Sequence, residues 1–338
     1  MKLKILNTLV VTAGLLVPMA VSQAQSPYNQ AVTGLSPVGY WPMHENEPTV
    51  AADIETNYGT LGTLETGFYG DWETLANTKI VHGQPGCIVN DSSETAVHFM
   101  QTSTSASTGS FTNGLIVPHT SPLSTLNPPF SVECWMNGDA SGNKQADIWS
   151  QAGANNGGLN GNANLSGIRL HWDNVGWNVY CYNGANGSTL NTLFTYNTGI
   201  AAGVWYHTVV TDDGTNITLW INGVAVKSAP QAGNYAPDSW DPLTLDAGVG
   251  GGIAFNDSMK GYIDEFAVYT NALSPADVTN HYSLGENSTA NAYFSAVISN
   301  NPTIYFLMNS PGITNDSPVA MLSNSGSSGI NGVYRPEV

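Results

Sequence analysis

The chain repeats part of its own sequence, and this repeat bounds the size of the unit that folds. Six residues near the N-terminus recur 265 positions later without a gap: Tyr28 as Tyr293, Ala31 as Ala296, Val32 as Val297, Pro37 as Pro302, Tyr40 as Tyr305 and Met43 as Met308. Matches at one offset in strand-like sequence indicate a structural repeat. We therefore expect a module at 27–285, a linker at 286–292 and the truncated start of a second, similar repeat at 293–338.

The first 24 residues have the features of a secretory signal peptide. Two lysines, at positions 2 and 4, precede an apolar run over 5–17, and the sequence SQA at 22–24 fits a cleavage site. The apolar run is shorter than the roughly 20 residues that a membrane-spanning helix needs. We predict cleavage after Ala24 and a secreted protein, extracellular or on the cell surface, that does not span a membrane.

Acidic residues outnumber basic ones, with 25 Asp and Glu against 8 Lys and Arg in the whole chain. Phosphate binding needs clusters of basic residues, so this composition excludes nucleic acid as a partner. An acidic surface favours solubility, and it also attracts divalent cations. Both interpretations of the charge stay open at this point.

From residue 128 onward, strand-like runs alternate with turn signals at short intervals, which is typical of an antiparallel β-sandwich. The run at 128–136, PPFSVECWM, alternates between two faces, and so does VWYHTVVT at 204–211. Asn222-Gly223 between two alternating runs predicts a hairpin. Ser274 followed by Pro275 predicts the start of one short C-terminal helix near 274–282. The predicted fold class is all-β.

Three of these segments together resemble one family. FSVECWM, WYHTVVTDDGTNITLWINGVAV and GYIDEFAVYTNALSPADVTNHY are similar to signature segments of laminin-G-like jelly-roll domains in the concanavalin A-like lectin/glucanase superfamily. The early SPVGYWPMHE, AAD and TNYG resemble that family's first strand and the turn after it. The resemblance covers about 28–285 and implies an antiparallel β-sandwich jelly roll. It does not define a function, because such folds host lectins, adhesins, spacers and hydrolases.

The three cysteines, Cys87, Cys134 and Cys181, are too few for a disulfide scaffold and have no metal-type spacing. Cys134 and Cys181 lie in apolar, strand-like segments and could pair across the core. Buried free thiols are equally compatible with this pattern. The sequence leaves the two alternatives open.

Calcium is the cofactor that the sequence supports. It takes oxygen ligands from carboxylates, Asn amides and backbone carbonyls, and AADIETNYG offers Asp53 and Asn57 in one turn. The resemblance implies that this turn lies near the last strand, where Asp264 occurs. A structural calcium would then be held by Asp53, Asn57 and Asp264, with Glu45 as a weaker addition. In the alternative, Asp53 and Asn57 cap the turn by bonding their own backbone.

A cluster of aromatic and amide side chains offers a candidate sugar platform. Trp172, Trp177 and Tyr180 occur close to Asn174 in RLHWDNVGWNVYCYNG. Aromatic faces stack on sugar rings, and amides bond hydroxyl groups. Aromatic residues in strands also pack in cores or across strands, which is the competing interpretation.

The sequence contains no arrangement expected of a glycoside hydrolase. A retaining enzyme needs two carboxyl groups about 5–5.5 Å apart, as acids at i and i+2 or i+4 of one strand provide. Glu133 stands alone, and Asp264 and Glu265 are neighbours expected on opposite faces. We therefore predict no enzyme and no catalytic residues, and instead a non-catalytic module of a larger repetitive extracellular protein. It would bind carbohydrate or adhere to glycans, matrix or a cell-surface polymer. The alternative hypothesis is a structural spacer without a ligand, and a polysaccharide hydrolase is the third hypothesis.

Overall fold

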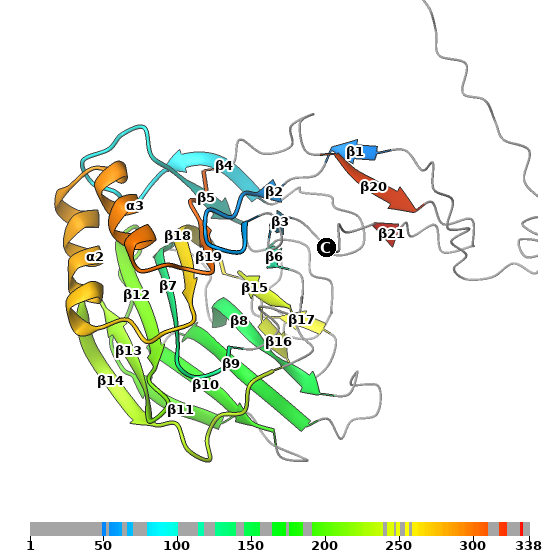
Figure 1. Cartoon of the computed structure of the whole chain (residues 1–338), viewed down its shortest axis with the longest axis vertical. Helices are drawn as coiled ribbons and strands as arrows, with labels where there is room; N and C mark the ends of the chain where they lie inside the picture. The colour runs from blue at the N-terminus through cyan, green and yellow to red at the C-terminus, as the bar shows by residue number, and fades with distance from the viewer. Residues whose placement is uncertain are drawn as a thin grey trace, which may run out of the picture.

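The computed structural model describes part of the chain, and the predicted signal peptide lies outside that part. The described residues are 49–51, 54–62, 66–69, 80–100, 114–117, 126–139, 145–155, 164–173, 176–184, 191–238, 242–246, 248–250, 254–256, 259–309, 318–322 and 332–333. Within them, two large antiparallel sheets pack face to face around one core (Figure 1).

The first sheet has eight strands. In spatial order they are β11 (Asn191–Tyr196), β10 (Trp177–Asn183), β9 (Asn164–Asp173), β8 (Gln145–Asn155), β15 (Leu243–Leu245), β6 (Leu115–Val117), β3 (Gly67–Tyr69) and β2 (Ile54–Glu55). The strand order departs strongly from the sequence order, as it does when a chain crosses between the two sheets of a jelly roll.

The second sheet faces the first. In spatial order it contains β14 (Val224–Pro230), β13 (Asn216–Ile221), β12 (Trp205–Asp212), β7 (Phe130–Gly138), β18 (Gly261–Tyr269), β5 (Thr95–Phe99) and β4 (Ile80–Pro85), with β19 (Ile304–Phe306) also paired to β18. Two small sheets complete the strands: β1 (Thr49–Ala51) with β20 (Pro318–Leu322) and β21 (Gly332–Val333), and β16 (Gly248–Gly250) with β17 (Ala254–Asn256). This architecture confirms the predicted antiparallel jelly roll.

The alternation predicted for β7 decides which residues form the core. Phe130, Val132, Cys134 and Met136 all lie in the apolar cluster between the two sheets. The intervening residues of β7 point to the outer face of the second sheet, where Trp135 belongs to a separate apolar cluster. A period of two along the strand therefore gives this sheet two buried faces, one on each side.

Two helices cover part of that outer face. α2 (Pro275–Asn287) begins where predicted, with a capping box between Ser274 and Asp277, but it runs beyond 282. α3 (Ala290–Ser299) was not predicted, and it starts inside the stretch expected to be a linker. Figure 1 shows both helices on one side of the strands β12, β7 and β18.

The residues expected to open a second repeat pack on the module itself. β19 pairs with β18, and α3 packs beside α2. The hairpin predicted at Asn222-Gly223 is present between β13 and β14, with both residues at positive φ (51° and 76°), as a tight two-residue turn requires.

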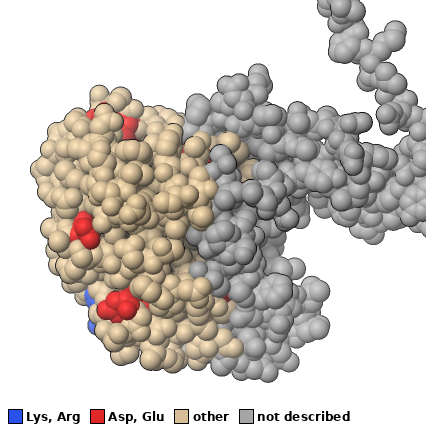
Figure 2. Space-filling view, viewed as in Figure 1, with Lys and Arg blue, Asp and Glu red and all other residues tan. Residues whose placement is uncertain are grey.

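The surface and the cysteines bear on function. On the described part of the face shown in Figure 2, most residues are uncharged, with scattered acidic side chains and few basic ones. Cys87, Cys134 and Cys181 are all buried and free. No helix among the described residues is long and apolar enough to cross a membrane.

Candidate functional site

The two tryptophans of the predicted sugar platform lie in the core. Trp172 on β9 and Trp177 on β10 are direct cross-strand partners, and they are 9% and 1% exposed. Trp177 packs its ring against Tyr206 of the opposite sheet at a centroid distance of 5.7 Å. Because both rings are enclosed, neither has a face free to stack on a sugar. The two tryptophans therefore pack in the core, as the competing interpretation of the sequence expected.

Tyr180 does not share their face. It lies on the outer side of the first sheet, half-buried, with the guanidinium of Arg169 over its ring at 4.8 Å. Arg169 donates to Asp147 at 2.7 Å, and His171 contacts the same carboxylate at 2.8 Å. The strand pattern thus separates Tyr180 from the tryptophans, and Asn174 lies outside the described residues.

Asn57 is engaged by the backbone of its own turn and of β19. Its Oδ1 accepts from the N–H of Gly59 at 2.7 Å and of Tyr305 at 2.9 Å, and its Nδ2 donates to the carbonyl of Thr303 at 3.3 Å. These bonds use the amide oxygen that a cation would need. The capping alternative therefore accounts for Asn57, while Asp53 and Glu45 lie outside the described residues.

Asp264 is fully buried, next to a second carboxylate that the sequence did not suggest. Its Oδ2 accepts from the N–H of Cys87 at 2.8 Å. Ligand atoms of Cys87, Glu94 and Asp264 all lie within 4.8 Å of one another. Burial, followed by the charges of Glu94 and Glu265, raises the pKa of Asp264 well above its usual value. Two carboxylates and no cationic side chain within this described cluster fit a hard divalent cation, since such ions prefer oxygen ligands. Burial also raises the pKa of the Cys87 thiol.

A register shift in β18 explains how Asp264 and Glu265 both become buried polar groups. The strand has an irregularity between Asp264 and Ala267, and Glu265 has φ of 51°. Such a bulge breaks the alternation that would have placed the two acids on opposite faces. The Tyr305 hydroxyl donates to the Glu265 carboxylate, and the Cys87 N–H donates to Asp264.

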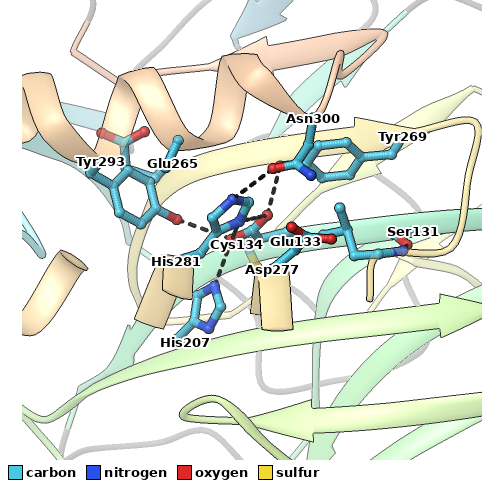
Figure 3. A network of polar contacts seen from close by, with 12 residues as sticks. Ser131, Glu133, Cys134, His207, Glu265, Tyr269, Asp277, His281, Tyr293 and Asn300 are labelled. Atoms are coloured by element: carbon cyan, nitrogen blue, oxygen red, sulfur yellow. Dashed lines mark hydrogen bonds and ion pairs between the residues drawn. The ribbon is translucent and has the colours of Figure 1, made fainter. Parts of the chain in front are cut away.

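Glu133 is the centre of a buried polar network between the second sheet and the helices (Figure 3). Its carboxylate accepts from His207 Nε2 at 2.7 Å and Tyr269 Oη at 2.7 Å, and contacts His281 Nδ1 at 3.0 Å. Burial would raise the pKa of Glu133, but the His281 charge and the histidine hydrogen bonds hold it well below its usual value. This network joins β7, β12, β18 and α2, so its role is to hold the helices on the sheet.

The helices leave one end of the same outer face uncovered, and a pocket of about 420 Å³ opens there. We call it the Trp205 pocket. It is lined by Pro85, Asn137, Asp139, Ala202, Gly203, Trp205 and Tyr262. Its volume lies in the range of small-molecule sites.

Three of the lining side chains come from one row across the sheet. Asn137 of β7 is directly opposite Trp205 of β12 on one side and Tyr262 of β18 on the other. Both aromatic side chains are half-buried. Asn137 is only 8% exposed, and its Oδ1 is buried and makes no hydrogen bond in the structure. The row therefore holds a buried acceptor without a partner, on a residue flanked by two aromatic residues.

Neighbouring groups fix the far side of the pocket. His98 stacks on Tyr262 with ring centroids 4.2 Å apart and contacts Asp139 Oδ2 at 3.2 Å. Lys260 lies 3.6 Å from the same oxygen. Asp139 is thus held from two directions at the rim of the pocket.

The sequence did not identify this pocket, because its residues come from four strands and two loops. Trp205 could be read only as part of the strand pattern of β12. The one available signal was an amide, Asn137, at an outward position of β7, but nothing in the sequence indicates that α2 stops short of it.

A family model described as the concanavalin A-like lectin/glucanases superfamily matches residues 108–279, just over half of the chain. No curated protein has a sequence that matches. Many solved structures match in fold.

Three solved structures illustrate the structural similarity. The binding domain of botulinum neurotoxin serotype G has a TM-score of 0.45 and 14% identity, over 70% of this chain and 51% of that one. Domain 4 of AbnA, a GH43 extracellular arabinanase from Geobacillus stearothermophilus in complex with arabinotriose, has a TM-score of 0.41 and 16% identity, over 68% of this chain and 98% of that one. The Ruminococcus gnavus IT-sialidase CBM40 bound to α2,3 sialyllactose has a TM-score of 0.36 and 16% identity, over 45% of this chain and 81% of that one.

The chain spans about half the length of the toxin binding domains that it matches. At identities of 14–16% and TM-scores below 0.5, these similarities carry no information about ligand or activity.

Proposed function

Because this chain belongs to the concanavalin A-like lectin/glucanases superfamily, we propose that it is a non-catalytic carbohydrate-binding or adhesive module that holds a sugar in the Trp205 pocket. The observation that carries the proposal is the buried, unpartnered Oδ1 of Asn137, a residue that lines that pocket. A buried acceptor without a partner costs about 1–3 kcal/mol, and a sugar hydroxyl that donates to it would remove this penalty.

The rest of the pocket suits the same ligand class. Trp205 and Tyr262 flank Asn137 and supply apolar ring surface, which suits the C–H faces of a pyranose. Asp139 adds a carboxylate that accepts hydrogen bonds from hydroxyl groups at the rim. An apolar cavity with a few placed polar groups is the usual form of a small-ligand site.

The placement of the acids favours binding without catalysis. Glu94 and Asp264 are close together, but Asp264 is fully buried and neither lines the Trp205 pocket. Asp139 is the one acid among the described residues that line it. Glycoside hydrolysis uses a pair of carboxyl groups on the scissile bond, so a single accessible acid supports a binding role.

The proposal includes export and a repeated architecture. The N-terminal sequence has signal-peptide features, and the 265-residue offset suggests that the module recurs in a larger repetitive protein. A secreted or surface module of this kind would meet its glycan on a matrix or a cell-surface polymer.

A structural calcium is part of the proposal, with a changed ligand set. Asp264 stays as a ligand, and Glu94 joins it as the neighbouring carboxylate. Asn57 leaves the set, because its amide is bonded to backbone on both sides. The cation would neutralise two buried carboxylates that otherwise repel each other.

The test is a glycan-array screen of the full chain, followed by calorimetric titration of the best ligand against Trp205→Ala. Removing the ring that forms one wall should weaken binding at least tenfold, which is about 1.4 kcal/mol. Trp220→Ala is the matched control, because Trp220 is also half-buried on the outer face, on the neighbouring strand β13, and does not line the pocket.

If Trp205→Ala and Trp220→Ala lose the same affinity for the glycan, the sugar does not bind in the Trp205 pocket. If the folded protein binds no glycan on the array, the structural-spacer alternative replaces this proposal.

A further inference from the structure

Residues 293–308 fill a slot in the module, which we call the β19 slot. One edge of β19 pairs with β18, with Ile304 opposite Val268 and Phe306 opposite Phe266. Its other edge is covered by the turn at 57–61, whose N–H groups donate to the carbonyls of Pro302, Thr303 and Tyr305 at 2.8, 3.2 and 2.8 Å. β19 is therefore inserted between two parts of the module rather than added at a free edge.

The turn approaches the inserted segment so closely that only glycine fits at one point. A Cβ atom on Gly59 would lie 2.5 Å from the carbonyl oxygen of Thr303. Without an occupant, this turn and β18 would leave a row of backbone groups unpaired.

Three side chains of the segment make specific contacts in the slot. The Tyr293 hydroxyl accepts from Trp135 Nε1 at 3.0 Å and donates to Glu133 at 3.2 Å. The Tyr305 hydroxyl donates to Glu265. The Met308 sulfur lies 3.8 Å from the Tyr69 hydroxyl oxygen. The slot thus selects a tyrosine, a second tyrosine twelve positions later and a methionine three after that.

The N-terminal copy carries those same residues at the same spacing. Six positions of 28–43 are identical to 293–308, and five of them correspond to buried residues of the docked segment: Tyr293, Val297, Pro302, Tyr305 and Met308. The exposed positions Ser295, Ser299 and Asn301 all differ from their counterparts. The repeat has therefore kept five of the seven buried positions of the segment and none of the three exposed ones. The two buried positions that differ are Ile304 and Phe306, whose counterparts are Gly39 and Trp41.

The chain length lets the N-terminal copy reach the slot. Position 308 contacts Tyr69, and Tyr69 in turn donates to Glu55 of β2 at 2.7 Å. Ten residues, 44–53, separate Met43 from the first residue of β2. Ten extended residues span about 33 Å. The position of residue 308 is joined to β2 through the single side chain of Tyr69, so it lies within that reach.

We propose that the β19 slot has two alternative occupants within this chain, residues 293–308 and residues 28–43. Residues 28–43 themselves lie outside the described residues. Either segment supplies the buried tyrosines and the methionine, so either completes the second sheet. The slot is then an interaction surface for any copy of this repeat segment, and the copy left out is the one available to another module.

Thermal melting of three full-length variants tests this proposal. The first blocks the C-terminal copy with Tyr305→Asp and Met308→Asp, and the second blocks the N-terminal copy with the matched Tyr40→Asp and Met43→Asp. The third combines all four substitutions. Each single block should lower the Tm by only a few degrees, because the other copy fills the slot. The combined variant should lose far more than the sum of the two.

Two results would overturn the proposal. If one block alone destabilises the protein as much as the combined variant, the slot accepts only that segment. If the two losses simply add, the copies do not substitute for each other.

Disulfide trapping in the full chain gives an independent readout. Val268 and Ile304 are cross-strand partners, so cysteines at both positions should cross-link. Gly39 is the counterpart of Ile304, and Val268→Cys with Gly39→Cys should cross-link in the chain whose C-terminal copy is blocked. Val268→Cys with Gln30→Cys is the control, because the counterpart Ser295 is exposed. Trapping at position 30 as efficient as at 39, or none at 39, contradicts docking in register.

Discussion

Glu133 and Asp264 are two fully buried carboxylates on the paired strands β7 and β18, and they differ in every neighbour that matters. Glu133 receives hydrogen bonds from tyrosine hydroxyls and lies against two histidines. Asp264 receives backbone N–H groups of Cys87 and Glu265, and it faces the carboxylate of Glu94.

The pKa values of the two carboxyl groups are therefore shifted in opposite directions. Burial favours the neutral acid in both, but the His281 charge overcomes it at Glu133, whose pKa is lowered. At Asp264 the nearby carboxylates add to burial, and the pKa is raised. Burial alone therefore does not define the role of an acid in this fold. Glu133 is an ionised anchor for the helices. Asp264 is an acid whose charged form is disfavoured here and would be favoured by a bound cation.

The largest expected effect comes from removing the Glu133 anchor. Glu133→Gln keeps the size of the side chain but takes away the charge that pairs with His281, and breaking a buried pair typically costs about 3–5 kcal/mol. Chemical denaturation should show this loss. We also expect amide exchange in α2 and α3 to rise more than in the first sheet.

Tyr269→Phe is the graded control for that variant. It removes one donor to Glu133 and leaves both histidines in place, so it should cost about 1.5–3 kcal/mol. Should Glu133→Gln prove no worse than Tyr269→Phe, the ion pair would not be what anchors the helices.

The sequence predicted the frame of this molecule better than its polar interior. Local alternation placed Phe130 and Val132 on one face of their strand, and the dipeptide Asn222-Gly223 predicted the hairpin turn, because both signals depend on adjacent residues. Glu133 could be read only as an isolated acid, since His207 and His281 lie 74 and 148 positions away in the sequence. Contacts over such separations are set by strand order, which alternation does not encode.

The candidate sites show the same limit. Trp172 and Trp177 are close in the sequence and are cross-strand partners in the structure, yet alternation alone does not say which face of a strand becomes the core. Asn137 and Trp205 meet only because β7 and β12 pair in one particular register. Glu94 joined Asp264 for the same reason, through packing between distant segments.

A smaller effect is expected from pH at the anchor. Burial lowers the pKa of His281, but the Glu133 charge and its hydrogen bonds raise it overall above 6.5. The folded state thus holds this proton more tightly than the unfolded chain, so its stabilisation is complete below pH 6.5. It is lost as the pH rises through the folded pKa. The lowered pKa of Glu133 acts in reverse, and its stabilisation is lost as the pH falls below 4.5.

The difference in unfolding free energy between the wild type and His281→Gln should therefore shrink as the pH rises from 6 to 9. Tyr269→Phe, measured in parallel, should show no such trend across the same range, because it keeps the His281 pair. A constant difference for His281→Gln would mean that the histidine is neutral in the folded protein.

A still smaller effect is expected from calcium at Asp264. If Asp264 and Glu94 hold calcium, millimolar calcium should raise the Tm of the wild type by a few degrees over the value in chelator, because an ion that binds only the folded state stabilises it. Asp264→Asn should abolish that increment. In chelator it should melt no lower than the wild type, since a neutral amide of the same shape replaces a buried acid that lies beside Glu94. Asn57→Ala is the discriminating control. The Asn57 amide bonds the backbone of Gly59 and Tyr305, so its removal should lower the Tm equally with and without calcium.

If calcium changes the Tm of no variant and not of the wild type, Asp264 is a buried acid that shares a proton with Glu94. The contrast with Glu133 would then lie in proton sharing and not in cation binding.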